Sequence, residues 1–494
     1  MPTVYRLNYC PDLDTNWSIN PGACTDMEGL APLANGNLTT FGDDAGHGFS
    51  TTGSDVLHAE MFTKTDGTVR LLAFRAGDID EYASDGTRTN RGTGYTTASD
   101  WDAAAWGNQI IAVSKANATQ SSTGAGFTAL GGSSPKAARI AANANFVMMA
   151  DVDDGGSNVY ADMVWWCGIR NPATWTPAQA TQAGNVRLLD EPGPIVAIAA
   201  FGDKFLAFKE NAIFLGQYIG PPYVFSWRVI SNVVGLSYPK ALTICDGKMY
   251  FVHRTGFFAF DGQQVSNVGQ GVNSIPASKG GGGGLVPMRA ASSEIEGIVW
   301  FCGYFVVSGT SYYMNVLALN ARTGLWARMG RTILSGDVQC PVVCTQAQLA
   351  AFREPTDSLS DVDPVADLTY FDNSSSPAYK VATISRDTPE VADVRAPTVT
   401  TGLIGTPERA GKMVRVYPRV VRGDPSDGTS TAYMRPLQTE YGSVSSSLMS
   451  YNTELGTYDA VSDARYHSIQ INWTTAANFE MAGLGVDRVE TGKR

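Results

Sequence analysis

The chain has 494 residues and a formal net charge of −11, from 36 Lys and Arg against 47 Asp and Glu. This acidic balance argues against a protein that grips nucleic-acid phosphates, because that task needs clustered basic side chains. Apolar residues make up 44% of the chain, charged residues 17%, and Gly occupies 52 positions. Such a composition favours β-structure with many turns over helical bundles.

The first 50 residues contain no apolar stretch of signal-peptide length, and we expect residues 1–50 to form an extended segment that docks on the following domain. The longest apolar run, Gly297 to Val307, is far shorter than the ~20 residues of a membrane span, so no span is expected. Cys167, Cys245 and Cys302 lie inside apolar runs. They are expected to be buried, reduced thiols, as in proteins made in a cytoplasm.

One short unit recurs in the region 51–383. It has a Gly-Asn, Gly-Asp or Asp-Gly turn, then a polar residue, then at least four apolar residues, which is the pattern of a hairpin leading into a well-covered strand. Strand–turn–strand patterns also cover Thr65 to Tyr82 and Val299 to Trp326. The three copies of the unit are Ala105–Val113, Ala200–Phe208 and Cys245–Val252.

Adjacent copies lie roughly 40–50 residues apart, which is the spacing of four-stranded propeller blades. A single blade cannot cover its own faces, whereas blades stacked around an axis bury both. The sequence therefore predicts an all-β fold with a β-propeller of six or seven blades over residues 51–383. A large β-sandwich with several hairpins is the alternative.

Other segments break this pattern. The stretch 270–290 includes five consecutive glycines, 280–284, and is expected to be a flexible loop. Glu354 to Asp363 is acidic and rich in Ser, and is expected to be a loop or an inter-domain turn. From residue 384 onward, strands with strict alternation predict a C-terminal β-sandwich over 384–494. Those strands are Met413–Pro418, Ser468–Trp473 and Phe479–Asp487.

No residue pattern predicts a catalytic, cofactor or metal site. The four His residues have no ligand spacing to one another, and the Cys340–Cys344 pair lacks partners. The stretch from Asp12 begins like a calcium loop but has Trp17 and Ala23 where Gly and Glu are required. The acidic stretch Asp151–Gly156 could hold a cation but fits a solvated hairpin tip better.

Two features bear on carbohydrate chemistry. The segment Ser293–Trp300 is the nearest approach to the repeated turn of sialidase-type propellers, but it departs from that pattern and occurs once. A set of aromatic residues could form a carbohydrate platform, although blade core is the favoured interpretation. That set is Trp165, Trp166, Trp175, Tyr223, Phe225 and Trp227.

Three passages resemble a bacteriophage family, the tail hub or nozzle proteins of short-tailed phages, also described as packaged-DNA stabilisation or tail tubular proteins. In the first, a strand ends, Pro sets a turn and Trp caps a blade. The resemblance covers roughly residues 138–330 and 400–494, whereas the first 50 residues match only loosely and the glycine run departs from the family. The passages are Trp165–Trp175, Ala200–Leu215 with Phe225–Trp227, and Ala464–Ile471 with Phe479–Asp487 and Gly492–Arg494.

The resemblance implies a non-enzymatic virion protein that forms a hexameric ring beneath the portal and its head-to-tail adaptor. Tail fibres or tailspikes and a needle would dock around the ring, and phage DNA would pass through its lumen without sequence-specific binding. Assembly in a bacterial cytoplasm suits reduced cysteines. Acidic lumen walls would keep the DNA mobile, so Asp and Glu are expected to outnumber Lys and Arg there.

Two other functions stay open at this stage. One is a receptor-binding or baseplate-type β-protein that contacts host glycans. The other is a propeller glycosidase, which would need a pair of carboxylates flanking the scissile bond.

Overall fold

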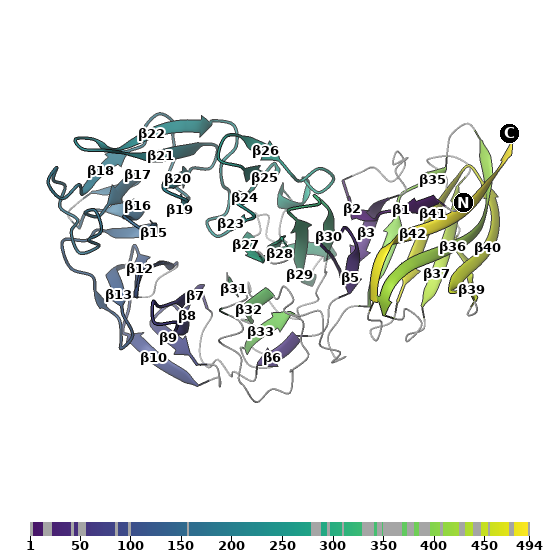
Figure 1. Ribbon diagram of the computed structural model, residues 1–494, viewed down its shortest axis with the longest axis horizontal. Helices are drawn as coiled ribbons and strands as arrows, with labels where there is room; N and C mark the ends of the chain where they lie inside the picture. Colours follow the sequence, from purple (N-terminus) through teal and green to yellow (C-terminus); the bar gives the residue numbers. More distant parts are fainter. Residues whose placement is uncertain are drawn as a thin grey trace.

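The protein is all-β. A short 3₁₀ turn, η1 (Ile275–Ala277), is present, and no helix in the described part is long and apolar enough to cross a membrane. Figure 1 shows a ring of sheets beside a smaller lobe that holds both ends of the chain. The computed structural model describes residues 3–12, 22–40, 44–47, 56–83, 87–96, 100–155, 158–277, 288–293, 297–308, 311–328, 340–342, 348, 368–372, 380–384, 396–405, 409–423, 430–437, 446–452, 455–473 and 479–492.

Six four-stranded antiparallel sheets follow one another along residues 58–328 of the described chain. In most neighbouring pairs the first strands contact each other, and the sheets radiate from a common axis like propeller blades (Figure 1). Their strands are β7 (His58–Thr63), β8 (Val69–Phe74), β9 (Asp78–Tyr82) and β10 (Arg88–Thr93); β11 (Asp102–Trp106), β12 (Gln109–Ser114), β13 (Asn117–Ser122) and β14 (Thr128–Ala129); β15 (Lys136–Ala142), β16 (Val147–Asp153), β17 (Val159–Trp166) and β18 (Gly184–Arg187); β19 (Ala197–Phe201), β20 (Lys204–Phe208), β21 (Ile213–Gly220) and β22 (Val224–Ser231); β23 (Leu242–Cys245), β24 (Lys248–His253), β25 (Gly256–Phe260) and β26 (Val265–Asn267); β27 (Met288–Ser293), β28 (Ile298–Ser308), β29 (Ser311–Asn320) and β30 (Trp326–Arg328).

A further four-stranded sheet completes the ring. Its first strand, β31 (Cys340–Val342), contacts both β27 and β7 and so lies between the last and first of the six contiguous blades. The next strands are β32 (Leu368–Asp372) and β33 (Lys380–Ile384). The fourth comes from the start of the chain, because β6 (Asp44–His47) pairs antiparallel with β33. The predicted β-propeller is confirmed, and the chain closes it with an N-terminal strand.

The middle strands are apolar because each blade is covered on both faces. In β20, Phe205 and Ala207 share a buried cluster with Trp166 of the preceding blade. The alternate residues Leu206 and Phe208 belong to a different buried cluster, which contains side chains of the following blade. Successive side chains of a strand point to opposite faces, so a strand buried on both sides must be apolar throughout.

The hairpin turns lie at the positions predicted from the sequence. Trp106 pairs with Gln109 across Gly107, and Phe201 pairs with Lys204 across Gly202. These glycines have φ of +60° and +62°, the left-handed region that favours Gly at the first position of a two-residue hairpin turn. The turns fix the pairing register of the two strands, and with this register the apolar side chains of each strand face the neighbouring blades.

The second lobe contains two seven-stranded sheets. One runs in the order β39-β40-β36-β42-β5-β4, with β1 also pairing β42; the other runs β2-β3-β34-β41-β37-β38, with β35 also pairing β41. Their strands are β1 (Thr3–Tyr5), β2 (Asn8–Tyr9), β3 (Ala23–Glu28), β4 (Leu30–Pro32), β5 (Leu38–Thr40), β34 (Thr398–Thr401), β35 (Ile404–Gly405), β36 (Ala410–Gly423), β37 (Thr431–Leu437), β38 (Ser447–Leu448), β39 (Ser450–Asn452), β40 (Thr457–Ala464), β41 (Tyr466–Asn472) and β42 (Phe479–Gly492).

The N-terminal segment differs from the expected extended arm. Strands β1 to β5 belong to the two sheets of the second lobe, where β1 pairs with β42 and β3 pairs with β34. The segment also touches the propeller, since the Asn8 side chain accepts a hydrogen bond from the Trp326 backbone N–H. The lobe expected from residues 384–494 alone is therefore built from both ends of the chain.

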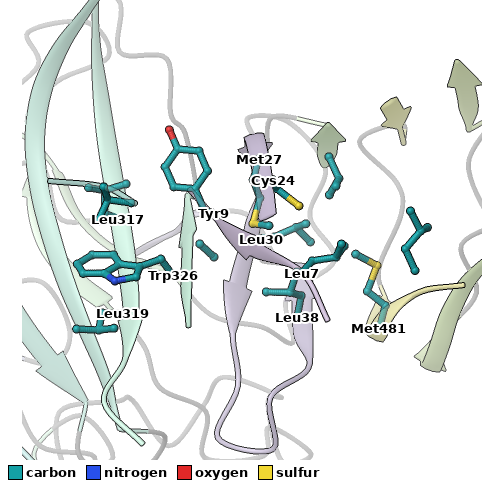
Figure 2. Close-up of a cluster of buried hydrophobic side chains, with 14 of the residues drawn as sticks. Leu7, Tyr9, Cys24, Met27, Leu30, Leu38, Leu317, Leu319, Trp326 and Met481 are labelled. Atoms are coloured by element: carbon teal, nitrogen blue, oxygen red, sulfur yellow. The ribbon is translucent and has the colours of Figure 1, made fainter. Parts of the chain in front are cut away.

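The N-terminal strands lie between the propeller and the C-terminal strands. Figure 2 shows Leu7, Met27 and Leu30 in this middle layer, with Trp326 of the propeller on one side and Met481 of β42 on the other. All five residues are buried and belong to one hydrophobic cluster. One continuous core thus joins the two lobes.

The loop expected at 270–290 is only partly described. Val272 is fully buried, and the Tyr238 hydroxyl donates a hydrogen bond to the Pro276 carbonyl, so the portion that includes η1 is packed on the propeller. The glycine run 280–284 and the acidic stretch 354–363 lie outside the described residues.

His467, in β41, makes the stability of the second lobe sensitive to acid. Burial, with a smaller contribution from the positive charge of Arg488, lowers the pKa of His467 to about 4. The unfolded chain takes up this proton near pH 6.5, so stability is lost as the pH falls from 6.5 towards 4, by up to about 3 kcal/mol. His467→Leu is expected to remove that part of the pH dependence in urea unfolding between pH 4 and 7. Equal slopes for the two proteins would contradict this expectation, and the comparison at pH 8 isolates the effect of packing.

Candidate functional site

A cavity of about 210 Å³ lies among the first strands of six blades. Each of β7, β11, β15, β19, β23 and β27 contributes to its wall, so the cavity lies near the propeller axis. The charged or titratable side chains in the wall are His58, Glu60, Asp102, Lys240 and Arg289. The remaining wall residues are small or apolar: Ala59, Ala103, Ile140, Ala197, Ile198, Pro239, Leu242 and Ala290.

Lys240 spans from the loop before β23 to the second blade. Its Nζ lies 2.6 Å from Oδ1 of Asp102 in β11, and both side chains are mostly buried. The other carboxylate oxygen, Oδ2, accepts a hydrogen bond of 3.1 Å from the backbone N–H of Ile140 in β15. Asp102 therefore connects three blades through one carboxylate.

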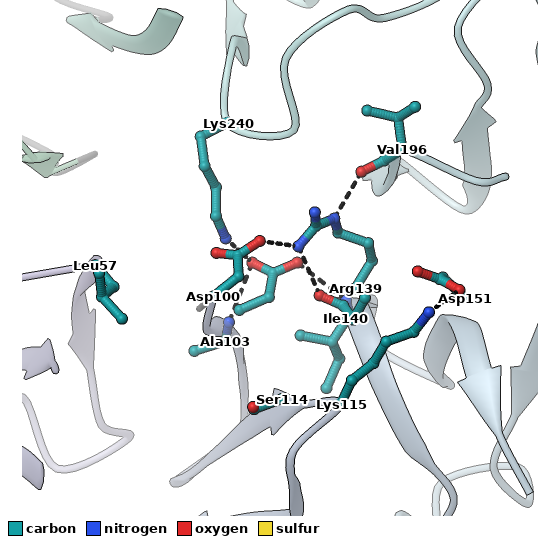
Figure 3. A network of polar contacts seen from close by, with 12 residues as sticks. Leu57, Asp100, Ala103, Ser114, Lys115, Arg139, Ile140, Asp151, Val196 and Lys240 are labelled. Atoms are coloured by element: carbon teal, nitrogen blue, oxygen red, sulfur yellow. Dashed lines mark hydrogen bonds and ion pairs between the residues drawn. The ribbon is translucent and has the colours of Figure 1, made fainter. Parts of the chain in front are cut away.

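Arg139 forms a second polar connection at the same level, which Figure 3 shows beside Lys240. Its Nε donates to the Val196 carbonyl at 2.6 Å, and its guanidinium also pairs with Asp100. On the other side of the cavity, Nη2 of Arg289 donates to the Leu57 carbonyl at 2.8 Å. These contacts link residues that are far apart in the sequence, and they hold the wall of the cavity in place.

His58 and Glu60 lie two residues apart on β7, with Nε2 and Oε2 3.6 Å apart. Burial raises the pKa of Glu60 to about 8; the negative charge of Asp102 adds to this effect and Lys240 opposes it. Burial lowers the pKa of His58 well below its ordinary value, and the charges of Lys240, Arg289 and Arg139 act in the same direction. At neutral pH, Glu60 mainly holds its proton and His58 is uncharged.

The aromatic residues considered as a carbohydrate platform are mainly core. Trp166, Trp175 and Phe225 are at most 6% exposed, and Trp227 packs against the same cluster as Trp166 and Phe225. Tyr223 is different, because 76% of it is exposed at the β21–β22 hairpin. The core interpretation thus holds for the buried members of the set.

The acidic stretch from Asp151 is occupied by protein contacts. Asp151 pairs with Lys115, as Figure 3 shows, and Asp153 accepts a hydrogen bond from the Gly155 N–H at 2.9 Å. No group of three or more His, Cys, Asp or Glu that could hold a metal exists among the described residues. The stretch 13–21 that follows Asp12 lies outside them, as does Cys344.

The expected buried thiols are confirmed. Cys167, Cys245 and Cys302 are buried thiols, as are Cys10 and Cys24 of the N-terminal segment. Burial raises the pKa of Cys167 to about 11, which keeps it protonated and unreactive at neutral pH.

The axial cavity was not predicted from the sequence. Its charged residues come from separate blades, with Glu60, Asp102 and Lys240 spread over 181 positions of the chain. A usable signal was present, since Glu60, Asp102 and Arg289 all belong to the first strands of their blades, which lie nearest the axis.

No known protein family matches this chain, and no curated protein matches it. Among solved structures, it is similar to catalytically inactive virginiamycin B lyase from Staphylococcus aureus with quinupristin, at 12% identity and a TM-score of 0.39 over 68% of this chain and 97% of that one. It is also similar to YCF48 bound to D1 peptide, at 11% identity and a TM-score of 0.37 over 72% of this chain and 97% of that one. A functional proposal for this protein must therefore rest on its own residues.

Proposed function

We propose that this protein is a structural component of the virion, the tail hub or nozzle of a short-tailed bacteriophage. It would form a hexameric ring that continues the DNA channel below the portal adaptor, retaining and then conducting the genome. The ring would carry fibres or tailspikes and a needle, and would assemble in the bacterial cytoplasm. In this role the chain positions partners and performs no reaction.

The observation that carries the proposal is the passage Trp165–Trp175, which resembles that family. Strand β17 ends at Trp166, and the indole N–H of Trp175 donates to the Pro172 carbonyl at 2.6 Å. The Trp165 indole in turn donates to the Trp175 carbonyl at 2.8 Å, and Trp175 is fully buried. This passage thus combines a strand end, a Pro turn and a capping Trp, the three features that resemble the family.

Two further features support the same role. We interpret the two seven-stranded sheets as the closing β-sandwich that the resemblance implies, extended here by strands from the N-terminus. The continuous core between the lobes suits a rigid ring subunit. The net charge of −11 suits a channel past which DNA slides, because like charges prevent it from adhering.

The assembly state tests this proposal. Light scattering and electron microscopy of the purified chain, alone and with a head-to-tail adaptor, are expected to give sixfold rings with a central opening and six times the 52.6 kDa mass of one chain. A ring needs a heterologous interface that closes. A chain that stays monomeric at all concentrations and with adaptor present would contradict the proposal. Cleavage of a glycan library by that monomer would favour the glycosidase alternative.

A further inference from the structure

We propose that the β21–β22 hairpin at the rim of the propeller binds a neutral oligosaccharide, with Tyr218 and Tyr223 as the stacking surface. Strand β22 is the outermost strand of its blade, so the hairpin lies on the outside of the ring (Figure 1). The inference concerns a surface of one chain and does not depend on the proposed virion role. It rests on the exposure of two aromatic rings, on the contacts that hold them, and on the uncharged sequence of the hairpin.

The hairpin presents two aromatic side chains to solvent. Tyr218, near the end of β21, is 40% exposed, and Tyr223, in the turn, is 76% exposed. In the part of the chain that the structure describes, no other aromatic side chain is among the exposed large apolar residues. A phenol ring combines an apolar face with a polar hydroxyl. A sugar ring matches this, because its C–H groups form an apolar face edged by hydroxyls.

Tyr218 is held in place by contacts to both its ring and its hydroxyl. Its ring centroid lies 5.5 Å from that of Phe146 and 6.0 Å from that of Phe225. Its hydroxyl donates a hydrogen bond of 2.7 Å to Oε1 of Gln182, in the connection between β17 and β18. The ring is therefore already ordered, and a ligand that covers it loses little affinity to the ordering of side chains.

Gln182 brings a hydrogen-bond donor beside this ring. Its side-chain oxygen accepts from Tyr218, and its backbone carbonyl accepts a hydrogen bond of 2.9 Å from the indole N–H of Trp166. None of the described contacts uses the side-chain NH₂ group of Gln182. That group can therefore donate to the hydroxyls of a sugar stacked on Tyr218.

The backbone at two positions of the site has an unusual conformation. Val224, which follows Tyr223, has φ of +62°, and Gln182 has φ of +60°. A β-branched residue is rare in this left-handed region, because its side chain crowds the backbone. Strained residues of this kind cluster at ligand-binding sites, where the position of a neighbouring group matters. Here they fix the backbone beside Tyr223 and the partner of Tyr218.

The segment that forms the hairpin carries no charge. From Ile213 to Trp227 the sequence has no Asp, Glu, Lys, Arg or His, although charged residues make up 17% of the chain. The hairpin itself thus offers no ionic partner to an acidic or a basic ligand. The ligand expected at this surface is an uncharged oligomer of hexose or N-acetylhexosamine.

Calorimetric titration of the full chain with maltohexaose, cellohexaose and chitohexaose tests the proposal. At least one of these oligosaccharides is expected to bind saturably, with millimolar affinity, because two rings and one amide make the contact. Binding is expected to be independent of salt concentration, since no charge takes part.

Four variants sharpen the test. Tyr223→Ala is expected to weaken binding about tenfold, as loss of one ring contact implies, whereas Tyr223→Phe keeps the ring and is expected to bind as the natural protein does. Gln182→Glu keeps an acceptor for Tyr218 but removes the amide donor, and is expected to weaken binding about fivefold. Leu189→Ala is the matched control, because Leu189 is 64% exposed and follows β18 outside the hairpin. It is expected to leave binding unchanged.

Failure of all three oligosaccharides to bind would overturn the proposal, as would unchanged binding by Tyr223→Ala. Loss of ring assembly in Tyr223→Ala, without any sugar binding by the natural protein, would instead make the hairpin a contact between copies of the chain. Sugar binding by a chain that stays monomeric would contradict the virion role alone, and sixfold rings that bind no sugar would contradict this inference alone. Tyr223 is mostly exposed, so circular dichroism is expected to show an intact fold in its variants.

Discussion

Replacing Trp326 by alanine is expected to lower the free energy of unfolding by about 3–5 kcal/mol. This side chain is 1% exposed, and its ring centroid lies 4.8 Å from that of Phe257 and 5.8 Å from that of Phe301. Its indole N–H donates to the Val268 carbonyl at 2.9 Å. The substitution therefore opens a large cavity and leaves the Val268 carbonyl without this donor, at the point where the propeller meets the second lobe (Figure 2).

Urea unfolding followed by circular dichroism measures this loss. Tyr223→Ala is the control, because Tyr223 is also a large aromatic residue but is 76% exposed, and its substitution is expected to change stability by no more than about 0.5 kcal/mol. Comparable losses for the two variants would mean that the core does not join the lobes at Trp326.

Replacing Asp80 by alanine is expected to cost about 3–5 kcal/mol, for an electrostatic reason. Its fully buried carboxylate lies 2.9 Å from Nε of Arg75 and 3.1 Å from Nε of Arg88, and it accepts a hydrogen bond of 3.2 Å from the Asn90 amide. The Arg75 side chain is only 2% exposed. Removing Asp80 would leave that buried guanidinium without its counter-charge.

Thermal or urea unfolding of three variants separates this charge effect from a general loss of packing. The double variant Asp80→Leu with Arg75→Met removes both buried charges and is expected to recover much of the loss. Asp162→Ala, which breaks the more exposed pair with Arg187, is expected to cost at most about 1 kcal/mol. If Asp80→Ala cost no more than Asp162→Ala, the buried pair would contribute little to stability.

The sequence predicted the blades well because their determinants are local. The turn at Gly202 and the apolar residues on both faces of β20 lie within a few residues of each other, so a short segment specifies the hairpin and its burial. The recurrence of such segments every 40–50 residues then implies stacking around an axis. The propeller follows from repeated short-range patterns.

The path of the N-terminal strands could not be predicted in the same way. Strand β1 is three residues long and pairs with β42, more than 470 positions away. A strand this short carries no sequence pattern that identifies its partner. Its pairing depends on where the folded propeller positions the N-terminal and C-terminal segments.

The axial cavity was missed for a related reason. Asp102 and Lys240 are ordinary polar residues in their local sequence, and only the closed ring brings them to 2.6 Å. The pKa of Glu60 likewise depends on neighbours from other blades. Sequence reasoning found the aromatic core residue Trp175 because its turn is local, and missed a site assembled from six blades.

The use of the N-terminal strands has a consequence for protein synthesis. During translation, residues 3–47 leave the ribosome before the strands that pair with them, so β6 must wait for β33 and β1 must wait for β42. The propeller ring cannot be completed before β33, which ends at Ile384, has been made, and the second lobe must wait for β42, which ends at Gly492. The nascent protein therefore has unpaired strand edges for most of its synthesis, a period in which chaperones would protect it from aggregation.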